Sequence, residues 1–412
     1  MRTRLRVRPT SRGWQALVIG LIVFAGARLI GTTQIHQLAY ALLALLVAAL
    51  VLGYFAARGL DFSRSLPVSR FFARRSSRID LLISNSSKLN SSHIKVLDRL
   101  PEPRGFESPP LSKGGGAAVE VPVTFPRRGL YSLGPADVQA VEPFGLLRFS
   151  RSFLDGDEVV VYPEVHEITN LPIQGGAVES GSRGARGQSG DDFAGLREYR
   201  RGDDMRHIHW KSLARTGELH VREFTLQAPL RYTVVLDLRR RGLKVPEAEI
   251  EDAVSATASV LAHLKEAGLP SRLICTDGES EATEFAADEA AYWKAMRVLA
   301  TVKDSGDTEL GVFLSEERGN LGEGLILVSR GIGGSEDLSA TVRRFRGGGR
   351  PVTVISVASH TYMGYPPGSQ ALADKAAAFS ASVDGLESEG ASVITVQQPE
   401  GAASLAYERS AV

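Results

Sequence analysis

Cysteine is almost absent from this chain of 412 residues, since Cys275 is the only one. A single cysteine excludes an intramolecular disulfide and any site that needs two thiolates, such as a Cys-x-x-Cys motif. It also fits a reducing compartment. Cys275 follows Leu273 and Ile274 in a predicted strand, so we expect a buried and unreactive thiol.

An excess of charge of either sign is also missing, because 48 Lys and Arg residues face 47 Asp and Glu residues. Bulk charge therefore gives no argument for a nucleic-acid partner. The sequence contains neither a Gly-x-Ser-x-Gly elbow nor a His-Glu-x-x-His motif. We therefore expect no enzymatic activity and no cofactor. The apolar content of 43% is ordinary for folded protein, and the length predicts two or three domains.

Two long apolar runs stand near the N-terminus, at residues 14–30 and 38–57, with a short polar connection between them. At about 1.5 Å per residue, the second run spans roughly 30 Å, the thickness of the hydrocarbon layer. Residues 1–60 are thus predicted to be a tail and a transmembrane helical hairpin. The alternatives are a signal peptide followed by one anchor, or a buried helix pair. No small-residue cleavage pattern precedes the second run, which disfavours the signal peptide.

The orientation of the hairpin follows from the charges beside it. Arginines flank it on both sides, whereas residues 31–37 contain neither Lys nor Arg. Positive flanks stay in the cytoplasm, so both termini and the soluble domains are predicted to be cytoplasmic. The flanking arginines are Arg2, Arg4, Arg6, Arg8 and Arg12 before the hairpin, and Arg58, Arg64, Arg70, Arg74, Arg75 and Arg78 after it.

Residues 61–168 contain short alternating runs separated by Ser, Asn, Gly and Pro, a pattern typical of a small β-sandwich. Residues 169–191 are rich in glycine but lack the Lys-Ser/Thr pair of a phosphate-binding loop, so a flexible linker is predicted. The strands predicted in the sandwich are 78–84, 93–97, 118–124, 138–141 and 159–162.

From residue 230 to 412 apolar strands alternate with amphipathic helices. This order predicts an α/β domain with a mostly parallel sheet covered by helices on both faces. The predicted strands are 232–236, 272–276, 325–329, 352–357 and 392–396, and the predicted helices include 250–264, 289–302 and 372–386.

Residues 192–229 form a segment in which opposite charges are densely mixed with large apolar side chains. Arginine makes planar two-point contacts with carboxylates, so such a segment can fix a surface shape. The expected apolar anchors are Tyr199, Ile208, Trp210 and Leu213.

This segment resembles the signature of a bacterial family, domain of unknown function fifty-eight. The resemblance rests on the run from Arg197 to Asp204, the run Arg206-His207-Ile208-His209-Trp210-Lys211, and Ala214-Arg215. The pieces Gly129-Leu130-Tyr131 and Glu142-Pro143-Phe144-Gly145 resemble those that precede the signature, although Glu142 stands where Asp is expected.

The resemblance implies a protein of the inner membrane that contains a doubly wound parallel sheet similar to a von Willebrand factor A domain. It also implies partnership with a MoxR-type ATPase and other membrane proteins, with the signature contacting a partner or a neighbouring domain. The residues that this assigns to partner binding are Arg197, Glu198, Tyr199, Arg200, Gly202, Asp203, Asp204, Arg206, His209, Trp210, Lys211 and Arg215.

Metal-binding von Willebrand A domains carry Asp-x-Ser-x-Ser after the first strand. Here only Asp237 matches, because Arg239 and Arg241 replace both serines and Arg330 stands where a later acidic ligand is expected. Arginine cannot bind Mg²⁺, so we expect no metal. If the fold matches, the three arginines lie at one sheet edge and could bind an anion. The alternative is ordinary salt bridges to Glu247, Glu249 or Asp337.

The pair His207-x-His209 raises a second alternative. With Asp203 or Asp204 it could form a two-histidine, one-carboxylate site, as in a metal-dependent hydrolase. An isolated His-x-His pair is weak evidence for a metal site, and packing beside Trp210 is the interpretation we favour.

Overall fold

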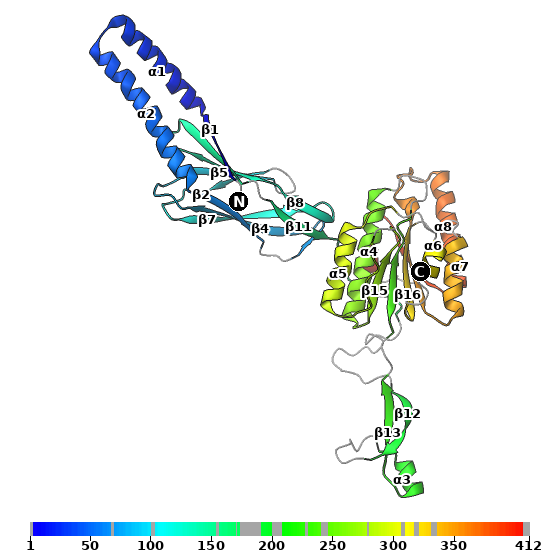
Figure 1. The fold of residues 1–412 in the computed structure, drawn as a ribbon. Helices are drawn as coiled ribbons and strands as arrows, with labels where there is room; N and C mark the ends of the chain where they lie inside the picture. The colour runs from blue at the N-terminus through cyan, green and yellow to red at the C-terminus, as the bar shows by residue number, and fades with distance from the viewer. Residues whose placement is uncertain are drawn as a thin grey trace. The chain divides into compact units, whose positions relative to one another are not determined.

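A computed structural model describes residues 3–66, 70–99, 104–153, 156–169, 171–173, 191–199, 208–226, 230–239, 246–277, 280–305, 310–316, 321–330 and 336–406. The chain divides into two compact units, Met1–Glu164 and Val165–Val412. Figure 1 shows the elements of both units.

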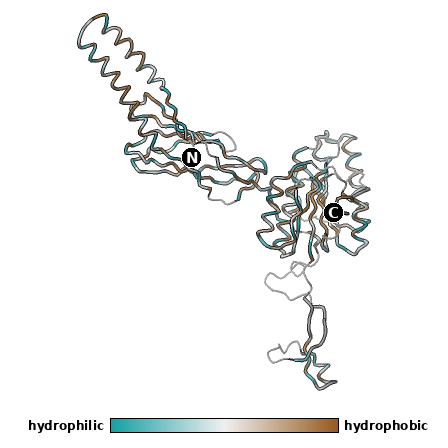
Figure 2. Tube along the Cα trace, in the orientation of Figure 1, coloured by the Kyte–Doolittle hydropathy of each residue, from teal (hydrophilic) through white to brown (hydrophobic). Residues whose placement is uncertain are grey.

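The first unit begins with the predicted helical hairpin, formed by α1 (Ser11–Ile30) and α2 (Thr33–Arg58). Both helices are long and apolar enough to cross a membrane. Large apolar side chains face outward along them, with Leu29 88% and Leu21 65% exposed, and Figure 2 shows that both helices are largely apolar. A soluble helix pair would bury such side chains, so the hairpin has the surface of a lipid-facing element.

The two helices begin earlier than the apolar runs indicated. The Thr10 hydroxyl accepts a hydrogen bond from the Gly13 amide at 3.1 Å, which caps α1 before the polar residues Ser11 and Arg12. Gly31 ends α1 in the left-handed region, at φ 73°, and α2 begins two residues later. The polar residues of the predicted connection are thus mostly helical, because hydropathy marks the apolar part of a helix and not its ends.

The residues before α1 form a strand, β1 (Thr3–Pro9), which sequence analysis treated as a tail. It pairs antiparallel with β10 (Leu147–Phe153), from Thr3 opposite Phe153 to Pro9 opposite Leu147. On the other side, α2 is followed directly by β2 (Leu60–Ser65). Both ends of the hairpin therefore continue into strands of the same unit.

Three sheets enclose one apolar core in this unit. The strand orders are β1-β10-β9-β5-β6, β2-β4-β7 and β3-β11-β8. Alternation along β4 buries Ile79, Leu81 and Ile83 on the core side. The five strands predicted here are all present. The remaining bounds are β3 (Phe71–Phe72), β4 (Ser76–Asn85), β5 (Ser92–Asp98), β6 (Arg104–Ser108), β7 (Gly116–Thr124), β8 (Gly129–Leu133), β9 (Ala136–Val141) and β11 (Asp157–Tyr162).

The second unit contains an all-parallel sheet of order β15-β14-β16-β17-β18, as the alternation of strands and helices predicts. One face carries α4 (Glu247–Glu266) and α5 (Glu289–Thr301), and the other carries α6 (Leu310–Glu316), α7 (Glu336–Gly347) and α8 (Gln370–Ser388) (Figure 1). The strands are β14 (Tyr232–Leu236), β15 (Ser271–Cys275), β16 (Gly324–Arg330), β17 (Val352–Val357) and β18 (Ser392–Val396).

The signature segment folds as a two-stranded antiparallel hairpin with a short helix. β12 (Asp191–Glu198) pairs with β13 (His220–Leu226), and α3 (Trp210–Thr216) lies between them in the sequence. Gly217, at φ 76°, ends α3. Residues 200–207 lie outside the described part of the chain.

Residues from the end of the predicted sandwich and the start of the predicted linker pack against the α/β domain. The His166 amide donates to the Ser259 hydroxyl at 2.9 Å, and the Thr169 hydroxyl donates to the Ala406 carbonyl at 2.9 Å. Leu171 and Ile173 are buried. The glycine-rich residues 174–190 lie outside the described residues.

Candidate functional site

The order of the parallel sheet identifies its ligand-binding edge. From β14 the chain continues to β15 on one side and then returns to β16 on the other, so the winding reverses between β14 and β16. In open α/β sheets, ligands bind outside the carboxyl ends of the strands at such a switch point. The residues at the ends of β14 and β16 are therefore the first candidates for a ligand-binding site.

Asp237, directly after β14, is buried at this switch point and has its carboxylate fully surrounded. Arg239 holds it from two nitrogens, with Nε to Oδ1 and Nη2 to Oδ2 both at 2.8 Å. The hydroxyls of Ser329 and Thr276 approach the same carboxylate at 3.3 and 3.5 Å. The side chain is only 3% exposed. This two-point geometry is the strong form of a charged hydrogen bond.

Arg330, the last residue of β16, forms the second half of this corner. Its Nη2 donates to Asp304 Oδ1 at 2.5 Å and to the Arg239 carbonyl at 3.1 Å, and its Nε donates to the Asp237 carbonyl at 3.4 Å. The side chain is 5% exposed. Its Nη1 is buried and has no hydrogen-bond partner among the described residues. The guanidinium thus ties the ends of β14 and β16 together.

These contacts do not fit a metal ion at the corner. Both oxygens of Asp237 already accept hydrogen bonds from Arg239, and Arg330 adds a second buried positive charge. A hard cation needs several free oxygen ligands. The described residues contain no cluster of three or more His, Cys, Asp or Glu residues suited to a metal.

The structure brings together two of the three arginines predicted to bind an anion. Arg239 and Arg330 meet at one edge, whereas Arg241 lies outside the described residues. The acidic partners that the structure shows for them are Asp237 and Asp304, and Glu249 accepts a hydrogen bond from the Ser359 hydroxyl. Anion binding at this edge stays a prediction, and Arg330 Nη1 is the group it would use.

A second polar cluster at the same edge was missed from the sequence. Asp252 of α4 accepts hydrogen bonds from the Tyr362 hydroxyl at 2.8 Å and from Gln398 Nε2 at 3.2 Å. Burial, with the nearby Asp252 carboxylate, raises the pKa of Tyr362. The available signal was an acidic residue, Asp252, directly before the mostly small and apolar run 253–264 of the helix. The cluster joins α4 to the segments after β17 and β18.

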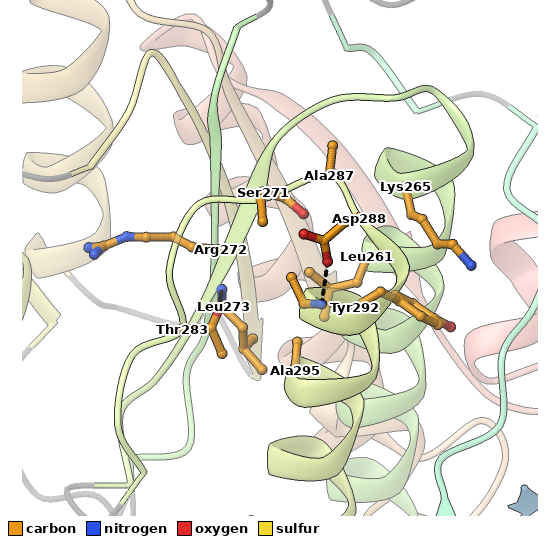
Figure 3. Close-up of a pocket in the computed structure, with 12 residues that line it drawn as sticks. Leu261, Lys265, Ser271, Arg272, Leu273, Thr283, Ala287, Asp288, Tyr292 and Ala295 are labelled. Atoms are coloured by element: carbon orange, nitrogen blue, oxygen red, sulfur yellow. Dashed lines mark hydrogen bonds between the residues drawn. The ribbon is translucent and has the colours of Figure 1, made fainter.

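Figure 3 shows a small pocket between α4, α5 and β15. Its carboxylate, Asp288, accepts a hydrogen bond from the Ala291 amide at 2.7 Å, so it caps α5. The Lys265 ammonium lies 4.8 Å from the centre of the Tyr292 ring. Arg272 points away from the pocket in this view. The polar groups here serve local structure, and we assign no site to them.

In the signature segment, Ile208 is 6% exposed and forms an isolated bridge with Val221, which is 4% exposed. Trp210 is 59% exposed. The expectation that Trp210 anchors the segment is therefore wrong. Trp210 stands at the first position of α3 and is exposed, whereas Ile208 precedes the helix and bridges Val221. Glu198, Lys211 and Arg215 are also exposed, and Tyr199 and His209 are partly buried.

Several predicted site residues lie outside the described part of the chain. They are Arg200, Gly202, Asp203, Asp204, Arg206 and His207. Arg197 is described only as backbone in β12, opposite Val221. The His207/His209/Asp203 site of the hydrolase alternative therefore has only His209 among the described residues.

We expect opposite outcomes for two alanine substitutions in this segment. Ile208→Ala removes a buried side chain and should cost about 2 kcal/mol or more of local stability. Trp210→Ala should change it by less than about 0.5 kcal/mol, because the indole is exposed. Hydrogen exchange of the β12 and β13 amides measures both. Equal protection loss in the two variants would contradict the burial described here.

Comparison with known proteins shows what this segment is similar to. The model described as "Protein of unknown function DUF58" matches residues 195–309. The uncharacterized protein YeaD of Bacillus subtilis strain 168 is 23% identical over 328 residues, which cover 74% of this chain and 79% of that protein. The resemblance inferred from the signature is thus confirmed.

Two of the solved structures that match this chain align with about a quarter of it, at low TM-scores. A CARDB domain from Pyrococcus furiosus, solved with di-metal ions, has a TM-score of 0.19 at 12% identity and covers 25% of this chain and 86% of its own. A PapD-like domain of human CEP192 has a TM-score of 0.16 at 13% identity, covering 24% of this chain and 84% of its own. Neither likeness supports a conclusion about fold or function.

Proposed function

We propose that this chain is a membrane-anchored interaction or assembly protein of the bacterial inner membrane, working with a MoxR-type ATPase. The observation that carries the proposal is the pairing of β1 with β10. It joins the residues before α1 to the folded unit that also contains β2, the strand after α2. An anchor of this kind enters and leaves the membrane on one side, as expected for two spanning helices.

The orientation rests on charge. Arg8 precedes α1, Arg12 lies in its first turn, and Arg58 ends α2. The turn at Gly31 and Thr32 has no charge. Since cytoplasmic flanks are enriched in Lys and Arg, we place both termini and both soluble units in the cytoplasm. Residue Cys275, which is buried and reduced, is compatible with that side.

The closed switch point favours an interaction role over catalysis. A von Willebrand A-like domain would present a metal here, but Arg239 already neutralises Asp237 and Arg330 holds Asp304. We infer that the α/β domain is of this type, because its sheet is parallel and doubly wound. In place of a metal, this edge of the sheet holds the ion pairs of Arg239 and Arg330. The exposed side chains of Trp210, Lys211 and Arg215 on α3 form a surface for a partner. Exposed Trp and Arg are typical of contact hot spots.

A topology experiment tests the anchor. A reporter that is active only in the cytoplasm should be active when it is fused after Val412. A tag inserted between Gly31 and Thr32 should be labelled from outside the cell. The hairpin turn and the C-terminus lie at opposite ends of spanning helices, so they must give opposite results. Labelling of both from the same side would contradict two spanning helices.

Affinity capture of the full chain from native membranes, with and without ATP, tests the partner in the same strain. A MoxR-type ATPase should be retained by the parent and lost with the triple variant Trp210→Ala, Lys211→Ala, Arg215→Ala. The matched control is Arg297→Ala, Met363→Ala, Lys375→Ala, whose residues are also exposed. Retention by the triple variant would contradict a role of α3, and stoichiometric metal in the purified parent would favour the hydrolase alternative.

A further inference from the structure

The turn between β9 and β10, Glu142-Pro143-Phe144-Gly145, is built against the first turn of α1. The Glu142 carboxylate accepts hydrogen bonds from the amides of Phe144, Leu146 and Leu147. The Thr10 hydroxyl donates to the Gly145 carbonyl at 2.7 Å. A rigid turn therefore sits at the base of the hairpin.

This turn exposes an aromatic ring toward solvent. Phe144 is 45% exposed, although its backbone is fixed on both sides. Trp14 in the first turns of α1 is 58% exposed, and Tyr54 and Phe55 near the end of α2 are 40% and 57% exposed. Aromatic side chains of this kind gather where a membrane protein meets the headgroup layer. Phe144 is the one that the soluble sheet contributes.

Three arginines surround the same place. Arg8 and Arg148 lie directly opposite each other on β1 and β10, so their side chains project from the same face of the sheet. Arg12 reaches the turn, with Nη1 3.7 Å from the point where a Cβ on Gly145 would lie. All three are exposed. Within the described ranges, none of the three has an ion-pair or hydrogen-bond partner for its guanidinium.

A bound anion would relieve the repulsion between these arginines. Like charges directly opposite on paired strands destabilise a sheet. Arg8 stands two residues before Thr10, so it lies about 7 Å along the strand from the start of α1. Long arginine side chains can reach an interface from that distance. The anion that the membrane itself supplies at this depth is the lipid phosphate.

Resting on the proposed membrane anchor, we propose that Arg8, Arg12 and Arg148 bind the headgroups of anionic phospholipids while Phe144 enters the interface beside them. The surface ties the sandwich to the membrane plane, so that the sandwich stands at a fixed height above it. A close fit supports this: Gly53 of α2 is packed on Phe149 of β10 so tightly that a Cβ would lie 2.0 Å from its ring. The last part of α2 is therefore packed closely on the sandwich.

The test uses the full chain in a neutral detergent, titrated with phosphatidylglycerol or phosphatidylcholine and observed by native mass spectrometry. Charges near an anionic lipid surface contribute about fivefold in affinity each. We expect the variant Arg8→Gln, Arg12→Gln, Arg148→Gln to bind phosphatidylglycerol at least about tenfold more weakly than the parent. The corresponding triple Lys variant should retain binding, since it keeps the charge.

The matched control is Arg75→Gln, Arg78→Gln, Arg127→Gln. Arg78 lies on β4 opposite Pro122, toward the end remote from Leu60 and the end of α2. This control should bind like the parent. Equal phosphatidylglycerol binding by the parent and the first Gln variant would overturn the proposal, as would no preference over phosphatidylcholine. Displacement by inorganic phosphate at millimolar concentration would overturn it in favour of a free-anion site.

Failure of the lipid proposal can be told apart from failure of the anchor. Carbonate extraction of membranes reports whether the hairpin is integrated. If the parent is extracted, the anchor itself is wrong. If the parent and the Gln variant both resist extraction and bind phosphatidylglycerol equally, only the headgroup proposal is wrong.

Discussion

Replacing Asp98 by alanine should lower the local free energy of unfolding of the β-rich unit by about 3–5 kcal/mol, because it strands a buried guanidinium. Asp98 and Arg64 are 0% and 2% exposed. Two hydrogen bonds join them, Nη2 to Oδ1 at 2.6 Å and Nε to Oδ2 at 3.1 Å. Arg64 also donates to the Gly134 carbonyl at 2.5 Å and to that of Leu133 at 3.3 Å.

This pair matters to the anchor because Arg64 belongs to β2, the strand that leaves α2, whereas Asp98 ends β5 in another sheet. Loss of the pair loosens the first strand after the membrane from the rest of the core. Hydrogen exchange of the β4 and β7 amides measures the effect, with the β14 and β17 amides as the internal reference. Those reference amides should keep their protection.

The double replacement Arg64→Met, Asp98→Leu is the informative control. Buried ion pairs can often be exchanged for apolar residues of similar volume at little cost or with a gain. We expect it to recover most of the lost protection. If the double variant is as unstable as Asp98→Ala, the cost lies in the hydrogen bonds of Arg64 to Gly134 and Leu133, and not in the stranded charge.

Arg64 also shows where sequence reasoning reaches its limit. Arg64 is one of the positive residues after the hairpin that predict a cytoplasmic flank. Its charge, however, is paired with Asp98 inside the folded unit. Its partner Asp98 is 34 residues away. Nothing in the spacing of either residue indicates the pair, because it depends on which strands meet across the core.

The strands of the α/β domain were predictable for a clear reason. In a parallel sheet covered on both faces, strands are continuous apolar runs. The predicted 232–236, 352–357 and 392–396 coincide with β14, β17 and β18. β1 was missed because the arginines of its sequence, TRLRVRP, also fit the charged flank of a membrane helix, although their alternation with apolar residues is typical of a strand. Only pairing with β10, more than a hundred residues later, makes it a strand.

At the candidate site, the sequence predicted the meeting of Arg239 and Arg330 at one edge, because the carboxyl ends of neighbouring parallel strands must be close. It did not predict Asp304, which lies beyond α5 and approaches Arg330 only through the tertiary fold. The exposure of Trp210 was not predictable either. Large aromatics are usually buried, and an exposed one is recognised only when the neighbouring backbone is placed.

The second large effect is expected at the switch point, where Asp237→Ala should cost about 3–5 kcal/mol of local stability. The substitution leaves Arg239 without the carboxylate that now holds two of its nitrogens. Exchange of the β14 and β16 amides, which end beside Asp237, reports this loss. Asp237→Asn should cost less, because the amide oxygen still accepts a hydrogen bond although the charge is gone.

A surface pair of the same geometry provides the control. Arg231 and Glu323 form a two-point contact at 2.8 and 3.2 Å, but they are 51% and 43% exposed. Glu323→Ala should therefore cost no more than about 1 kcal/mol. If Glu323→Ala and Asp237→Ala cost the same, burial is not what makes the switch-point pair strong.

A double variant of the same corner decides whether this edge binds cations or anions. Millimolar Mg²⁺ should not shift the melting temperature of the parent, because only binding to the native state stabilises it and Asp237 is already held by Arg239. Sulfate strengthens burial in any protein, so its effect is compared between the parent and the double variant Arg239→Ala, Arg330→Ala. A larger sulfate shift in the parent supports an anion at Arg330 Nη1. Equal shifts of the melting temperature in sulfate would mean that both arginines only join β14, β16 and Asp304. A saturable shift of the melting temperature with Mg²⁺ in the parent would show that Asp237 can bind a metal.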